Sequence, residues 1–399
     1  MESVPEKSRF LTSGDEAGTA PADRAFRPDV EGLRALAIMI VVAFHVGIRR
    51  VPGGYAGVDV FFVISGFVIT GVLMRDRQLT GRIGFIEFYA RRARRILPMA
   101  LLVIVASLLA MHALVASSAW PLLNGDARWS SLFVANFRFA SVTPTILTQR
   151  IQSPFEHYWS LAVEEQFYIV YPALFVAAVL TLRRLSLRTA LTILLVVVVV
   201  VSLWVSVSSS HVGQLGAYYL PFARAWELAV GALVAVCTET WRRIPHHFGA
   251  ALSWVGLAGI LWSAAEISLR IPYPGAIAIL PVASAALVII GGTSAPSWGA
   301  ESLLGLAVFR SIGRVSYSWY LWHWPFLAIA AARAHTSVLA SPLGKNLVLA
   351  TLALGLSYLT YRFVEQPVRH ARWLIDRAGY SMAGAALLVG SCMVLTYLW

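Results

Sequence analysis

Apolar runs long enough to cross a lipid bilayer recur along this chain of 399 residues. A membrane-spanning helix needs about 20 mostly apolar residues, because the hydrocarbon core is about 30 Å thick. The chain is 58% hydrophobic and 13% charged, whereas soluble domains carry about 25% charged residues. The sequence therefore predicts an all-α, polytopic transmembrane helix bundle of about eleven spans. The expected spans are residues 34–50, 56–75, 96–116, 158–182, 188–208, 217–237, 249–267, 275–292, 315–333, 346–366 and 381–399.

Arginines are concentrated in the short loops between these runs. The net charge of +12 would suit a nucleic-acid partner, but cations clustered beside membrane spans instead set orientation, with positive loops inside. Eleven spans with a cytoplasmic N-terminus place most arginines inside and the C-terminus in the extracytoplasmic space. A further apolar stretch at 125–140 then belongs to a long outer loop, 117–157. Counting it as a twelfth span would move Arg183, Arg184 and Arg188 outside, so the charge bias favours eleven.

The chain divides into three expected parts. Residues 1–26 are polar and are predicted to be a flexible cytoplasmic tail. Residues 27–370 form the main membrane domain, and residues 371–399 form an inner linker followed by one extra transmembrane helix. Cys237 and Cys392 stand alone in apolar stretches, so neither a disulfide framework nor a metal site is expected.

Arg34 and His45 lie eleven residues apart in the first apolar run, LRALAIMIVVAFHVG. In a helix this spacing is close to three turns, so both side chains share one face about 16 Å apart. An ionisable group at that membrane depth is costly and usually functional, and histidine titrates near neutral pH. A cation at one membrane face below a buried imidazole predicts chemistry across the bilayer. The alternatives are an arginine that only anchors topology and a histidine that only bonds a neighbouring helix.

The segment FYARRARRILP, at 88–98, opens the third expected span with four arginines. Arg91 and Arg94 share one helix face, and Arg92 and Arg95 share another. Guanidinium forks suit phosphate oxygens, and a helix N-terminus adds a favourable dipole. The segment predicts an inner-face site for a phosphorylated cofactor. Ordinary positive-inside topology or binding of anionic lipid is the alternative.

The segment HYWSLAVEEQFYIVYP, at 157–172, places Ser160, Glu164 and Tyr168 on one helix face. A carboxylate in an apolar helix is costly unless it is paired or neutral. At its expected depth, Glu164 is placed to orient His45 or to hold it protonated, and a structural contact between helices is the alternative. Asp59, at the outer end of the second span, is a second candidate partner for His45, or else a cap or an outer-face polar contact.

The ninth expected span contains VSYSWYLWHWPFL, at 315–327. Ser316, Tyr320 and either His323 or Trp324 share a face, where they line a channel or simply pack. Tyr320 and His323 are our candidates for contact with a bound cofactor. Near the end of the tenth span, Arg362 and Glu365 are three apart and are expected to pair at the inner rim.

These segments together resemble the acyltransferase family 3 membrane enzymes, which include bacterial O-antigen and peptidoglycan O-acetylases. The resemblance covers residues 27–370, in the expected order. The matching stretches are RPDVEGLRALAIMIVVAFHVG, GGYAGVDVFFVISGFVIT, FYARRARRILP, HYWSLAVEEQFY, YSWYLWHWP and RFVEQP. The family's arginine–x10–histidine motif maps onto Arg34 and His45, its arginine pairs onto residues 91–95, and its serine–x3–glutamate motif onto Ser160 and Glu164.

The resemblance implies a multi-pass enzyme of the bacterial inner membrane. Such an enzyme takes an acyl group, usually acetyl, from cytoplasmic acyl-CoA and transfers it to a hydroxyl of an extracytoplasmic glycan or lipid-linked saccharide. CoA would dock on Arg34 and the 91–95 cluster, and His45 would act as general base, tuned by Glu164 or Asp59; an acyl-histidine intermediate stays open. Lipopolysaccharide, peptidoglycan and a small secreted glycoside or macrolide are all open as acceptors. A flippase of lipid-linked sugars and a non-catalytic scaffold are the competing hypotheses.

Overall fold

The computed structural model describes residues 27–115, 120–146, 152–211, 216–268, 270–294 and 297–398. Every regular element in these ranges is helical. The tail predicted over 1–26 lies outside them. The elements are α1 (Pro28–Val46), η2 (Gly54–Ala56), α2 (Gly57–Thr80), α3 (Phe85–Leu114), α4 (Trp120–Ser131), α5 (Ala135–Ile146), α6 (Tyr158–Thr181), α7 (Leu187–Ser209), α8 (Gly216–Tyr219), η4 (Pro221–Ala223), α9 (Ala225–Val236), α10 (Thr238–Trp241), α11 (His246–Glu266), η5 (Ala276–Ala278), α12 (Ile279–Ser294), α13 (Glu301–Leu304), α14 (Ala307–Arg333), α15 (Leu343–Thr360), η6 (Tyr361–Glu365), α16 (Gln366–His370), α17 (Arg372–Ile375) and α18 (Ala378–Leu398).

Eight helical segments in the described part of the chain are long and apolar enough to cross a membrane. Each of the eleven expected spans overlaps a helix, and the three that fall short of this standard are α1, α9 and α14. The helix α9 has only 12 residues, and α1 carries Asp29, Glu31 and Arg34. The middle of α14 has no charged residue but is rich in serine, tyrosine and tryptophan, which lower its hydropathy. The all-helical membrane fold is confirmed, whereas the count of eleven and the orientation of the two ends stay predictions. The outer loop expected at 117–157 contains two 12-residue helices, α4 and α5.

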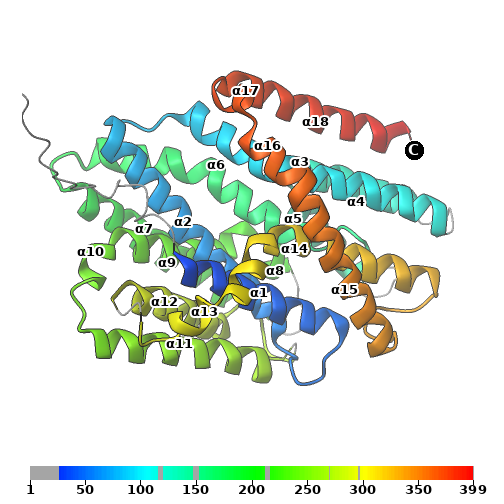
Figure 1. Ribbon diagram of the computed structural model, residues 1–399, viewed down its shortest axis with the longest axis horizontal. Helices are drawn as coiled ribbons and strands as arrows, with labels where there is room; N and C mark the ends of the chain where they lie inside the picture. The colour runs from blue at the N-terminus through cyan, green and yellow to red at the C-terminus, as the bar shows by residue number, and fades with distance from the viewer. Residues whose placement is uncertain are drawn as a thin grey trace, which may run out of the picture.

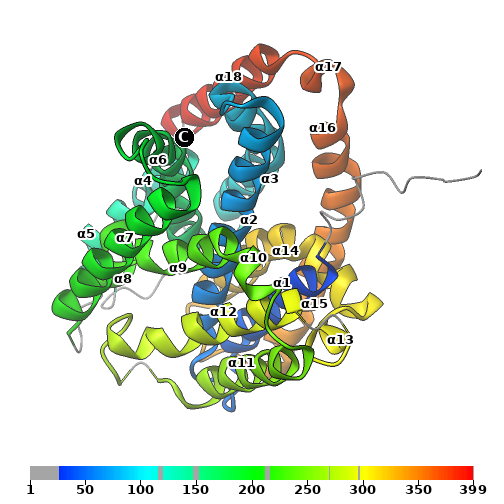
Figure 2. The same cartoon turned by 90° about the vertical axis from the view of Figure 1, so that its left-hand side faces the viewer.

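The helices are arranged around a central group formed by α1, α2, α9 and α14. The most extensive helix contacts are those of α11 with α12, of α2 with α9 and of α1 with α14. Figures 1 and 2 show α11 and α12 along the lower edge, α3 and α18 along the upper edge, and α1, α2 and α14 between them. Helices from distant parts of the sequence therefore meet at the centre, where the candidate site lies.

Glycines allow the central helices to approach one another closely. A Cβ built on Gly66 of α2 would lie 1.8 Å from the Leu228 carbonyl oxygen of α9, and one built on Gly231 would lie 1.9 Å from the Val63 carbonyl oxygen. A side chain at either position would push α2 and α9 apart. This is the small-residue packing expected between membrane helices.

Candidate functional site

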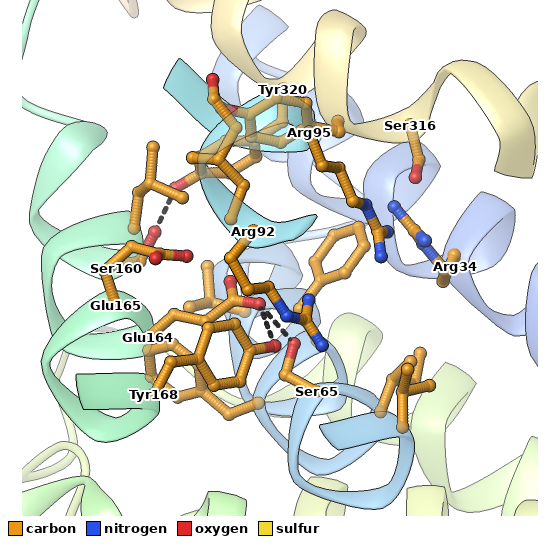
Figure 3. Close-up of a pocket in the computed structure, with 18 residues that line it drawn as sticks. Arg34, Ser65, Arg92, Arg95, Ser160, Glu164, Glu165, Tyr168, Ser316 and Tyr320 are labelled. Carbon is orange, nitrogen blue, oxygen red and sulfur yellow. Dashed lines mark hydrogen bonds between the residues drawn. The ribbon is translucent and has the colours of Figure 1, made fainter. Parts of the chain in front are cut away.

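A cavity of about 800 Å³ lies between α1, α2, α3, α6 and α14. Figure 3 shows its polar side chains pointing inward from all five helices. The residues that line it are Arg34, Val58, Phe61, Phe62, Ile64, Ser65, Val68, Arg92, Arg95, Ile96, Ser160, Leu161, Glu164, Glu165, Tyr168, Ser316, Tyr317 and Tyr320. Eleven of these eighteen residues have a polar or charged side chain, so the cavity offers many hydrogen-bonding groups to a ligand.

One part of this cavity is lined by the guanidinium groups of Arg34, Arg92 and Arg95. Figure 3 shows those of Arg34 and Arg95 pointing toward one another. Within the described ranges, none of the three arginines forms a hydrogen bond or an ion pair, although Arg92 lies over the Tyr168 ring at 4.5 Å. Like charges held together away from bulk water are costly unless an anion joins them. The arrangement therefore fits an anionic ligand.

A second hollow, the vestibule, adjoins the cavity and has a volume of about 720 Å³. It is lined by Val72, Phe88, Arg91, Arg92, Arg94, Arg95, Arg369 and His370. Because Arg92 and Arg95 line both spaces, the vestibule lies directly beside the arginine part of the cavity. Arg369 and His370 were not among the binding residues expected from sequence. The sequence did offer one indication of their role: they lie just after the RFVEQP motif. The helix α16, to which both residues belong, contacts α3.

The two arginine pairs of α3 have different roles in the structure. Arg92 and Arg95 face the cavity, as their shared helix face allows. Arg91 is exposed and pairs with Asp76. Arg94 is buried and donates from Nη1 to the Leu374 carbonyl oxygen at 3.0 Å and to Ser381 Oγ at 2.7 Å. Arg94 thus fastens α18 to α3, and neither Arg91 nor Arg94 lines the cavity.

Glu164 lies on the cavity wall, where it is held by two hydroxyl donors. Its Oε1 accepts hydrogen bonds from Ser65 Oγ at 2.6 Å and from Tyr168 at 2.6 Å (Figure 3). The expected contact between Glu164 and His45 is not among its interactions. Beside it, Oε1 of Glu165 is buried in the cavity wall and has no hydrogen-bond partner among the described residues.

His45 pairs with His323 of α14 rather than with a carboxylate. The His45 Nδ1 and His323 Nε2 atoms are 3.0 Å apart. Nδ1 of His323 lies 2.7 Å from the Tyr320 carbonyl oxygen, which can only accept, so this nitrogen carries the proton. With both rings neutral, His323 Nε2 must then accept from His45 Nδ1. This arrangement leaves His45 Nε2 unprotonated and suitable as a base.

His45 does not line the cavity. Its ring lies 5.2 Å from the His323 ring and 4.8 Å from the Trp324 ring. Ser160 and Tyr320 do line it, and their hydroxyl oxygens are 2.6 Å apart. Arg34 and His45 therefore lie on one helix, as predicted, but the cavity reaches the histidine pair only through Tyr320, whose ring lies 5.6 Å from that of His323.

Asp59 lies in a separate buried ionic cluster. Its Oδ1 accepts from Arg224 Nη1 at 2.6 Å, and the same nitrogen donates to Glu227 at 2.8 Å. Tyr273 donates to the other Asp59 oxygen. All three charged groups are at most 1% exposed. Asp59 is thus not a partner of His45 here, and Arg224 and Glu227 were missed, although charges within an apolar run are themselves a signal.

No set of three or more histidine, cysteine, aspartate and glutamate side chains in the described ranges is arranged to hold a metal ion. The polar groups of the cavity are guanidinium groups, carboxylates and hydroxyls. The guanidinium groups that line the cavity and the vestibule suit a ligand with an anionic group, and the hydroxyls and carboxylates suit a ligand that also forms hydrogen bonds.

Comparison with known proteins identifies related chains. A family described as an acyltransferase domain has a model that matches residues 27–362. Similar curated proteins are the peptidoglycan O-acetyltransferase OatA of Listeria monocytogenes, 29% identical over 88% of this chain and 57% of the relative, and the O-acetyltransferase OatA of Staphylococcus aureus, 27% identical over 86% and 57%. The putative peptidoglycan O-acetyltransferase YrhL of Bacillus subtilis is 29% identical over 86% of this chain and 55% of its own length. The chain thus spans somewhat more than half the length of these relatives. No solved structure matches it.

Proposed function

The chain belongs to the acyltransferase domain family, and on this premise we propose that it is a membrane O-acyltransferase that uses acyl-CoA, acetyl-CoA in the first instance. The acceptor is a hydroxyl of an extracytoplasmic glycan. The observation that carries the proposal is the vestibule of arginines beside a cavity that holds three guanidinium groups without an ion pair among the described residues.

The donor binds through its phosphates. CoA carries several negative charges on one end and a long, nearly neutral pantetheine arm on the other. Arg92, Arg95 and Arg369 offer charge-assisted hydrogen bonds to the phosphates. The arm then enters the cavity past Arg34 and Glu164 toward Ser160. Glu164 acts there as a positioning residue, because its carboxylate is already engaged by Ser65 and Tyr168.

The reaction uses Nε2 of His45 as general base. This nitrogen takes the proton of the acceptor hydroxyl, the hydroxyl oxygen attacks the thioester carbonyl, and the carbon–sulfur bond breaks. The proton then passes from His45 to the departing thiolate, giving CoA and an ester. General-base catalysis contributes about 10²–10⁴-fold. Transfer through an acylated His45 would require the same free nitrogen.

The acceptor is proposed from the relatives. Two of them are named as peptidoglycan O-acetyltransferases, one putatively, which favours peptidoglycan over lipopolysaccharide for this chain. The side of the membrane from which each substrate arrives follows from the predicted orientation, with the arginine end cytoplasmic.

Purified protein in vesicles, supplied with acetyl-labelled acetyl-CoA and peptidoglycan fragments, tests the proposal. We expect labelled glycan and one free CoA per ester formed. If a small glycoside is labelled and the peptidoglycan fragments are not, the proposed acceptor is wrong but the acyltransferase activity stands. A flippase of lipid-linked sugars or a scaffold would release no CoA. No CoA release with any glycan, from protein that binds CoA, would contradict the proposed activity.

A further inference from the structure

The proposed chemistry needs the acyl carbon to meet His45, but the cavity that leads from the arginines ends before it. Phe61 and Ser160 both contact Tyr320 in the wall of this cavity. Beyond Tyr320 lies His323, with ring centroids 5.6 Å apart, and beyond His323 lies His45, at 5.2 Å. The Tyr320 ring thus contacts the cavity on one side and the histidine pair on the other.

The side chain of Tyr320 is held in this closed position by two hydrogen bonds. Its hydroxyl lies 2.6 Å from Ser160 Oγ and donates to the His157 carbonyl oxygen at 3.0 Å. Phe61 packs against the ring edge-to-face, with centroids 6.3 Å apart. Ser160 belongs to the first turn of α6 and His157 is the residue just before that helix, whereas Tyr320 belongs to α14, so the closure joins two helices that flank the cavity.

The backbone of the same residue has a second role that does not depend on the position of the ring. The Tyr320 carbonyl oxygen accepts the hydrogen bond from His323 Nδ1. Rotation of the Tyr320 side chain would leave this carbonyl in the helix. The tautomer of His323, and through it the free Nε2 of His45, would therefore persist while the ring moves.

We propose that Tyr320 is a gating residue for the acyl group. With its ring bonded to α6, it closes the cavity to His45, and rotation of the ring admits the thioester. This inference rests on the proposed function for its purpose, although the closure itself can be tested without any acyl transfer. It assigns Tyr320 a role in access rather than in binding the donor.

Thiol accessibility measures the closure directly. In a background with Cys237 and Cys392 replaced by serine, His45→Cys reports on the far side of the gate and Ser316→Cys reports on the cavity itself. A membrane-impermeant methanethiosulfonate reagent is applied to each face of sealed vesicles in turn. The face from which Ser316→Cys reacts identifies the vestibule side.

From that side, we expect His45→Cys to react slowly when Tyr320 is present. A closed gate that opens about 1–10% of the time slows modification about 10–100-fold, so adding Tyr320→Ala should raise the rate at least tenfold. Tyr320→Phe keeps the ring but loses both hydrogen bonds and should give an intermediate rate. The matched control is Tyr317→Ala, because Tyr317 lines the same cavity and bonds to the Ile96 carbonyl oxygen at 2.8 Å, away from the gate. That variant should leave the rate unchanged.

Three results would overturn the gate. They are equal rates for His45→Cys with and without Tyr320, an increase of the same size with Tyr317→Ala, or no reaction with Tyr320→Ala while Ser316→Cys still reacts. None of these would bear on CoA release by the unaltered protein, so failure of the gate and failure of the proposed function are distinguishable.

Discussion

Replacing Arg92 by glutamine removes one guanidinium from the point where the vestibule meets the cavity. Within the described ranges the side chain has no ion pair to lose, although it does lose its position over the Tyr168 ring, so its removal acts chiefly on the bound donor. A hydrogen bond to a charged group contributes about 1.5–3 kcal/mol, and each 1.4 kcal/mol changes affinity about tenfold. We therefore expect the Kd for CoA to rise about 10–150-fold, with a weaker dependence on salt.

Titration of detergent-solubilised protein with CoA at two salt concentrations measures this change. The matched control is Arg242→Gln, because Arg242 is exposed and pairs with Glu239, at 2.7 Å. A surface pair of this kind contributes at most about 1 kcal/mol, and it lies outside both hollows. Unchanged CoA affinity in Arg92→Gln, or an equal loss in Arg242→Gln, would refute the assignment of the phosphate site.

Three further predictions follow from other parts of the structure. His323→Phe keeps a ring against His45 but removes the nitrogen that accepts its hydrogen bond. We expect kcat to fall about 10²-fold or more while KM for the donor stays constant. A change in KM alone would argue against a catalytic role for the His45–His323 hydrogen bond. Burial raises the pKa of the Glu156 carboxyl from 4.5 to about 7, so the folded state holds the proton more tightly than the unfolded state. The free energy of unfolding should therefore be greatest at acid pH and should decline as the pH rises from about 4.5 through 7, by at most about 3 kcal/mol. In Glu156→Gln, the melting temperature should decline less over this pH range. Arg224→Met leaves Asp59 and a second carboxylate buried without their cation, and should lower the free energy of unfolding by about 3–5 kcal/mol, measured as loss of thermal stability in detergent.

The helical membrane fold could be predicted because each span carries its own signal. Bilayer thickness fixes the length of an apolar run, and all eleven expected segments overlap helices. The number of true spans is harder to predict, because α1 and α14 bring charged and polar groups into the centre of the bundle. Those same groups form the site, so the helices that matter most to function are the least apolar.

The site could be predicted only as far as one helix allows. Spacing along α3 separated Arg92 and Arg95 from Arg91 and Arg94, but could not indicate which pair faces the cavity. That choice depends on α18, which engages Arg94 from 287 residues away in sequence.

The partner of His45 lay beyond prediction for the same reason. His323 is 278 residues distant along the chain, and the nearer carboxylates Asp59 and Glu164 were the more obvious candidates. Asp59 is instead engaged by Arg224, 165 residues away. Contacts of this kind depend on how helices pack, and no periodicity within a single helix carries that information.

The central claim is that His45 performs the chemistry on a donor held by the arginines. Its most direct test is to measure CoA affinity and acyl transfer together for His45→Gln in sealed vesicles. We predict a CoA Kd unchanged within about twofold and a turnover reduced by at least about 10²-fold. Turnover close to that of the unaltered protein, with CoA still bound, would contradict the account.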